Sequence, residues 1–171
     1  MKIKSLLTIA LTSLLFFSCE DSAQKVINVN DAVITAYNNV YYDSKVLEDK
    51  LSEVIEAETM KEADFKGLTE VRLKFKTTVD ENLKKAEEIE NYGGSEEFKT
   101  AVIDYLKHMQ SLNDFVIKFE AFTEETTGEE LLAWVNELDK KANLETSLIN
   151  KVQNAQTNFA KKNNLELIEQ K

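Results

Sequence analysis

Hydrophobic side chains recur at steps of three and four residues through most of the chain beyond residue 30. Such steps place them along one side of an α-helix, in the heptad pattern of a coiled coil or bundle seam. No segment shows the strict alternation of a β-strand. The four stripes are Val33, Tyr37, Val40, Ser44, Leu47, Leu51 and Val54; Leu68, Val71, Phe75, Val79, Leu83 (or Asn82), Ala86 and Ile89; Phe98, Val102, Tyr105, Met109, Leu112, Val116 and Phe119, widened by Ile103, Leu106 and Ile117; and Leu131, Trp134, Val135, Leu138, Ala142, Leu148, Val152, Ala155 and Phe159. The pattern predicts helices near residues 31–58, 64–90, 96–122 and 128–162.

Short polar segments between these stripes carry the residues that start and stop helices. Gly93 and Gly94 suit the left-handed conformation found at a helix C-terminus. Glu130 stands three residues after Thr127, which is the spacing of a capping box. We expect the last helix to fray or break near Asn143 and again at residues 163–164. The predicted N-caps are Asn30 or Asp31, Asp64, Ser95 and Thr127.

Four helices of about 25 to 35 residues joined by short links are expected to run up-down-up-down. Each would be about 40–50 Å long. The composition agrees, because the chain has no proline and only four glycines, too few for the many turns of a sandwich or barrel. The sequence therefore predicts an all-α, up-down-up-down four-helix bundle over residues 31–171.

The first nineteen residues differ from the rest. Lys2 and Lys4 precede an apolar run, residues 6–17, that only three hydroxyl residues interrupt. Twelve helical residues span about 18 Å, well short of the roughly 30 Å hydrocarbon core of a bilayer. The segment is therefore typical of a secretory signal peptide rather than a membrane span, and we assign residues 1–18 to it.

Ser18 and Cys19 follow the apolar run directly, and Cys19 is the only cysteine of the chain. A lone cysteine at this place resembles the lipobox of bacterial lipoproteins, in a relaxed form with Phe16 and Phe17 before Ser18, as in lipoproteins of Bacteroidota. The resemblance implies cleavage before Cys19 and acylation of that residue, palmitate included. Residues 19–30, which are polar and mixed, would then form a lipid-anchored tether.

The charge of the chain excludes one class of partner. With 21 basic and 31 acidic side chains, the formal net charge is −10. Such a surface repels phosphate backbones, so we expect no nucleic-acid partner. It also repels anionic lipid headgroups, which leaves the N-terminal acyl group as the expected contact with a membrane.

His108 is the only histidine, and Asp104 lies one helical turn before it on the same side. One histidine cannot build a structural zinc site, and no Glu-x-x-His pair is present for a di-iron centre. Met109 lies next to His108 and points elsewhere on a helix, which disfavours a haem ligand pair. No nucleophile has a base at a suitable spacing. We therefore expect His108 on the flank of the bundle, no metal or other cofactor, and no catalytic residue.

Tyr37, Tyr41 and Tyr42, with Asn38 and Asn39, form the most distinctive local composition. Tyr37 and Tyr41 share one helical face, while Asn38 and Tyr42 share the neighbouring one. The rings either pack against the next helix with their hydroxyls at the rim, or line a polar-aromatic recess. Contact with a ligand or partner is expected at Tyr37, Tyr41, Tyr42 and His108.

Two interpretations of the function follow. The first is a non-catalytic binding or interaction protein of the cell envelope, held by lipid at the outer membrane and contacting an envelope protein. The second is a carrier or sensor of a small ligand, which would use a recess between helices near Tyr37 and Tyr41. The second is favoured if the tyrosines and His108 line one concave pocket. The first is favoured if the interior is filled and an apolar patch lies outside.

Overall fold

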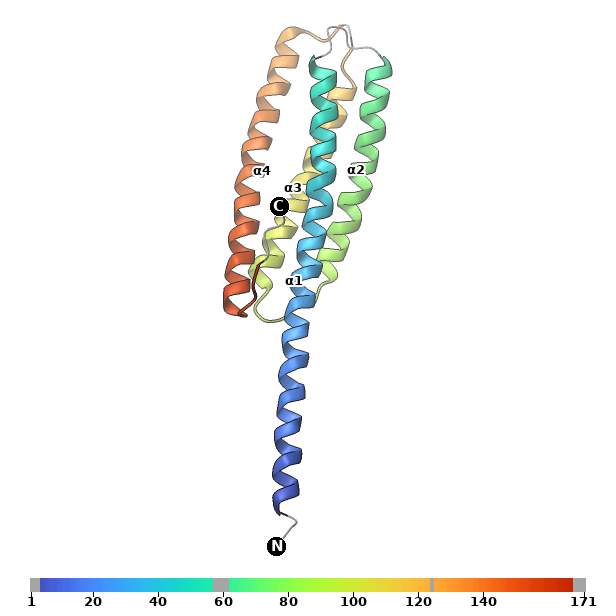
Figure 1. The fold of residues 1–171 in the computed structure, drawn as a ribbon. Helices are drawn as coiled ribbons and strands as arrows, with labels where there is room; N and C mark the ends of the chain where they lie inside the picture. Colours follow the sequence, from blue (N-terminus) through green and yellow to red (C-terminus); the bar gives the residue numbers. More distant parts are fainter. Residues whose placement is uncertain (1–3, 57–61, 124, 168–171) are drawn as a thin grey trace.

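The chain folds into an all-α, up-down-up-down four-helix bundle (Figure 1). The structure is a computed structural model, which describes residues 4–56, 62–123 and 125–167, and side chains for 22–56, 65–123 and 125–167. The helices are α1 (Lys4–Glu56), α2 (Glu62–Glu88), α3 (Glu96–Glu120) and α4 (Gly128–Lys162). No strand occurs within those described ranges.

α1 is longer than the sequence pattern predicts. It passes without a break through residues 22–30, so Asn30 and Asp31 lie inside the helix and cap nothing. Val26 is buried, and its side chain lies 3.1 Å from the place where a Cβ on Gly93 would stand. The segment packs on the α2–α3 link, where Ser22 Oγ also lies 3.1 Å from the Tyr92 hydroxyl. The N-terminal part of α1 projects beyond the bundle (Figure 1).

The core follows the predicted stripes closely. All seven predicted positions of α1 are buried, as are all seven of the main α3 stripe. Fully burying a large apolar side chain such as Phe or Leu contributes about 1.5–3 kcal/mol, so these stripes dominate the stability. Ile117 and Ala142 are exposed instead, because the core faces only about a third of each helix circumference.

The helix junctions show which predicted caps form. Thr127 and Glu130 make the reciprocal capping box that their spacing predicts. Gly93 and Gly94 have φ of 64° and 80°, the left-handed region that glycine adopts freely. Ser95 is the N-cap of α3, but its hydroxyl accepts from the Tyr92 backbone instead of capping the helix.

Two further predictions about helix ends were wrong. α2 begins at Glu62, so Asp64 lies within the helix and is not its N-cap. α4 is continuous through Asn143, where a break was expected. It ends at Lys162 as predicted, followed by Asn164 with φ of 53°.

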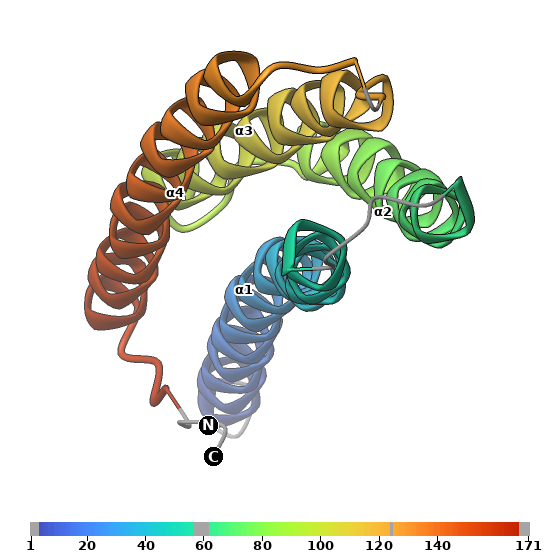
Figure 2. The ribbon, with the colours of Figure 1, turned by 90° about the horizontal axis from the view of Figure 1, so that it is seen from above.

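The bundle is open along one side. α1 packs closely on α2 and α3, and α3 packs on α4. α4 packs on α3 and stands apart from α1 over most of their length (Figure 2). Long side chains rather than backbone contacts therefore bridge α1 and α4, and two hollows form between them.

Candidate functional site

The groove between α1 and α4 is the candidate site, and it has two sections. The larger, which we call the tyrosine section, has a volume of about 460 Å³, within the range of roughly 300–1,000 Å³ typical of small-molecule sites. One hydrogen bond crosses it, from Gln156 Nε2 to Asn30 Oδ1 at 3.3 Å. Its lining is mostly amide, carboxylate and phenol groups: Asn30, Asp31, Ile34, Tyr37, Asn38, Tyr42, Val152, Gln153, Gln156, Glu166 and Leu167.

The smaller hollow, which we call the carboxylate section, has a volume of about 260 Å³. It lies further along α1 and nearer the start of α4, with α3 contributing Leu112. Three acidic side chains and an apolar wall line it. Its residues are Glu48, Leu51, Ser52, Ile55, Leu112, Leu138, Asp139, Ala142 and Glu145.

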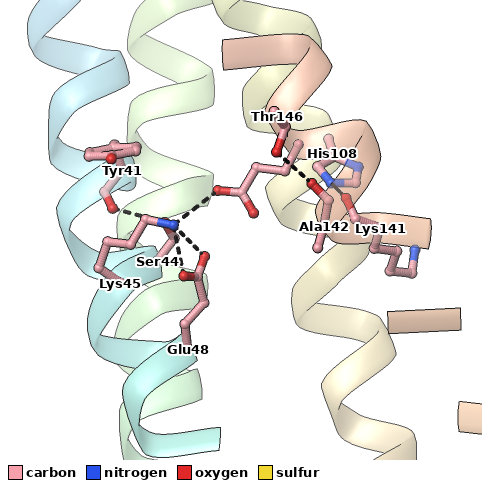
Figure 3. A network of polar contacts seen from close by, with 9 residues as sticks. Tyr41, Ser44, Lys45, Glu48, His108, Lys141, Ala142 and Thr146 are labelled. Carbon is pink, nitrogen blue, oxygen red and sulfur yellow. Dashed lines mark hydrogen bonds and ion pairs between the residues drawn. The ribbon is translucent and has the colours of Figure 1, made fainter. Parts of the chain in front are cut away.

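Lys45 lies on α1 between the two sections, and its ammonium is the central group of a network of polar contacts (Figure 3). Its Nζ donates to Glu48 Oε1 at 2.8 Å and to Oε2 at 2.7 Å. The same ammonium lies 5.3 Å from the centre of the Tyr41 ring and 3.7 Å from Glu145 Oε1 on α4. Lys45 therefore joins α1 to α4 across the groove.

Glu145 is the buried charge of this site, with only 8% of its side chain exposed. Burial raises the pKa of Glu145, the neighbouring Glu48 carboxylate raises it further, and Lys45 partly offsets both effects. The Oε1 atom of Glu145 receives no hydrogen bond, because the Lys45 ammonium stays beyond hydrogen-bonding distance.

Sequence analysis missed Glu145, although a signal for it exists. Leu138, Glu145 and Val152 are seven residues apart, so Glu145 continues the apolar stripe of α4. A carboxylate at a stripe position is unusual, because burying an unpaired charge is costly. That misfit, rather than any motif, marks the residue.

The structure brings two of the three predicted tyrosines into the groove. Tyr37 is buried, and its ring lies 4.8 Å from that of Tyr105 and 5.7 Å from that of Tyr41, centre to centre. Burial raises the pKa of Tyr37 to about 12, and the charges of Tyr41 and Glu145 add to the shift. Tyr42 is 59% exposed and lines the tyrosine section beside Asn38, the residue predicted to share its face. Tyr41 lies next to the groove, stacked on Tyr37 and facing Lys45.

His108 lies apart from the tyrosines, in the contact between α3 and α4 (Figure 3). Its Nε2 is 3.0 Å from the backbone oxygen of Lys141, and the residue is buried. Asp104 does not orient the ring, since its carboxylate pairs with Lys151 at 2.6 Å. Burial lowers the pKa of His108, and the nearby Lys141 charge acts in the same direction. His108 thus occupies the flank of the bundle and does not line the groove.

Cys19 falls within α1, in the part that projects from the bundle, and its side chain lies outside the described residues. Within the described part of the chain, no helix has both the length and the apolar character needed to cross a bilayer. Among the described residues, no three His, Cys, Asp or Glu side chains gather in a way that could hold a metal ion.

Comparison with protein-family models, with curated proteins and with solved structures finds no match to this chain.

Proposed function

We propose that this chain is a lipid-anchored, non-catalytic binding protein of the cell envelope, and that the groove between α1 and α4 receives its ligand. The observation that carries the proposal is the parting of α1 from α4, which opens a concave surface beside Tyr37 and Tyr42. In a closed bundle these positions would pack against α4.

The lining of the tyrosine section favours a small ligand over a protein partner. Amide and carboxylate side chains from both helices line the hollow, which favours a ligand with several hydrogen-bonding groups. Tyr42 adds an exposed aromatic ring on which a ligand can pack. The hollow is concave, as small-molecule sites are. His108 plays no part in this proposal, because it faces α4 from another side.

The anchor and the groove belong to one helix on this proposal. Cys19 and Tyr37 both lie in α1, eighteen residues apart, which corresponds to about 27 Å of continuous helix. Acylation of Cys19 at the outer membrane would therefore hold the tyrosine section a short, defined distance from the bilayer surface.

Extraction of bound compounds tests the proposal. The full chain is purified from its native host, and the compounds that it releases on denaturation are identified by mass spectrometry. Gln153→Trp fills the tyrosine section and should abolish carriage. Asn154→Trp adds the same ring at the next, exposed position of α4, which does not line the groove, and should leave carriage intact. Equal carriage by both variants, or no compound on the unaltered chain, contradicts the proposal.

A further inference from the structure

The carboxylate section holds more negative charge than the surrounding cations balance. Glu48, Asp139 and Glu145 all line it. Among the described residues, Lys45 is the one cation within 4.0 Å of Glu48 or Glu145. Lys45 is itself 43% exposed at its side chain and is shared between those two carboxylates. A ligand that enters this hollow therefore meets a net negative surface.

The Oε1 atom of Glu145 is the second, independent sign of a ligand. The atom is buried at the wall of the hollow and receives no hydrogen bond. An ionised carboxylate oxygen in that position loses its hydration and has only the Lys45 ammonium, 3.7 Å away, to replace it, which is costly in a folded protein. An N–H donor placed in the hollow would supply the missing hydrogen bond.

The lining of the hollow also changes in character from one end to the other. Glu48 and Glu145 lie at the end nearest Lys45, and Leu51 and Ile55 follow one and two turns further along α1. Leu138 faces them from α4, two turns before Glu145. Ile55 is partly exposed there, although it is a large apolar side chain. Asp139 follows Leu138 directly, so the α4 wall keeps a carboxylate there, and the change from charged to apolar runs along α1, from Glu48 to Leu51 and Ile55. A charged end followed by an apolar strip on α1 fits a ligand with the same two parts.

We propose that the carboxylate section binds a small organic ammonium ion: a primary amine carried on a short apolar chain. The ammonium donates to Glu145 Oε1 and to Glu48, in place of the Lys45 ammonium, and the apolar chain lies against Leu51, Ile55 and Leu138. An organic donor suits the site better than a metal ion, because no metal-binding group of acidic side chains gathers among the described residues. The inference goes beyond the proposed function, because it assigns a ligand class to the second section of the same groove.

Calorimetry with a defined probe tests the inference. The full chain in detergent is titrated with hexylammonium, and in parallel with 1-hexanol and with hexanoate, which have the same apolar chain. Hexylammonium should bind at least about tenfold more tightly than either, because one charge-assisted hydrogen bond contributes that much or more. Equal binding of the alcohol and the ammonium overturns the proposal.

Three variants sharpen the test. Glu145→Gln should weaken hexylammonium binding about tenfold or more, since it removes the buried charge. Lys45→Met should strengthen binding, because it removes the internal cation that competes for the same carboxylates. Glu137→Gln alters another acidic residue of α4, which pairs with Lys140 outside the groove, and should change nothing. Matching affinities for Glu145→Gln and Glu137→Gln would overturn the assignment.

The two proposals fail separately. If Gln153→Trp abolishes carriage of a native compound while hexylammonium does not bind, the groove remains a binding site and the ammonium assignment alone is wrong. Circular dichroism checks that each variant is folded before its binding is measured.

Discussion

Lys45 on α1 and Glu145 on α4 face each other across the open side of the bundle, with 3.7 Å between Nζ and Oε1. The pair is asymmetric, since Lys45 is partly exposed and gives its short hydrogen bonds to Glu48, whereas Glu145 is buried. Glu145 thus bears most of the desolvation and receives little compensation. A buried carboxylate that is incompletely paired lowers the free energy of unfolding. Its position in the wall of a hollow is what a ligand-binding role would require.

Glu145→Gln is expected to raise the free energy of unfolding at pH 7 by on the order of 1 kcal/mol. The pKa of Glu145 is raised in the folded state, so the folded chain holds the proton more tightly than the unfolded chain. The contribution of Glu145 to the free energy of unfolding is therefore fully present below the pKa that its carboxyl group has in the unfolded chain. It is lost as the pH rises through the pKa that the group has in the folded chain. Urea unfolding of both proteins at pH 4.5 and pH 7 measures the difference. A loss of stability in the variant at pH 7 would contradict the role given to this side chain.

His108→Gln is expected to remove a source of acid sensitivity. The pKa of His108 is lowered by burial, so the unfolded chain takes up a proton on acidification more readily than the folded chain. This contribution to stability is present above the unfolded pKa of about 6.5 and is lost as the pH falls through the folded pKa. A glutamine keeps an N–H donor for the Lys141 oxygen but does not titrate. Unfolding at pH 7.5 and pH 5.5 should show a smaller loss for the variant, and equal losses would refute the prediction.

Arg72, the only arginine described, joins α2 to Glu120 of α3 through a 2.7 Å contact between largely buried side chains. Arg72→Ala should cost about 3–5 kcal/mol, because it leaves the Glu120 carboxylate buried without a partner. The double variant Arg72→Met, Glu120→Leu should recover most of that loss, since no charge remains unpaired. Thermal and urea unfolding measure both, and a double variant as unstable as Arg72→Ala would show that packing rather than charge is responsible.

Thr127→Ala should lower the free energy of unfolding by about 1 kcal/mol, because it removes the side-chain half of the capping box at the start of α4. Thr100→Ala provides the control. Thr100 is exposed and lies within α3, where alanine has a higher helix propensity than threonine. If the two variants unfold alike, the cap contributes nothing measurable.

Cys19→Ala should abolish metabolic labelling by palmitate and release the chain from the membrane fraction, because the acyl anchor is proposed to form on that thiol. Ser18→Ala, which keeps a small residue before the cysteine, should leave labelling unchanged. Labelling that persists without Cys19 would rule out the proposed anchor.

Local pattern determined most of the helical structure. Every stripe position that the three- and four-residue spacing predicted in α1 and in the main stripe of α3 is buried, because a helix presents the same side at those steps whatever it packs against. The capping box at Thr127 and the two left-handed glycines were likewise predictable, since each depends on residues within a single turn. Composition and helical face singled out Tyr37 and Tyr42, which line the groove, and also Tyr41 and His108, which do not.

Tertiary structure alone decided the rest. Residues 22–30 are mostly polar in sequence, yet they continue α1, and Val26 packs beside Gly93, far away in the sequence. The parting of α1 from α4 depends on how all four helices share the core, which no local period records. That parting creates the groove. Helical periodicity sets which face of each helix is apolar, and only the packing of side chains between helices sets which faces meet.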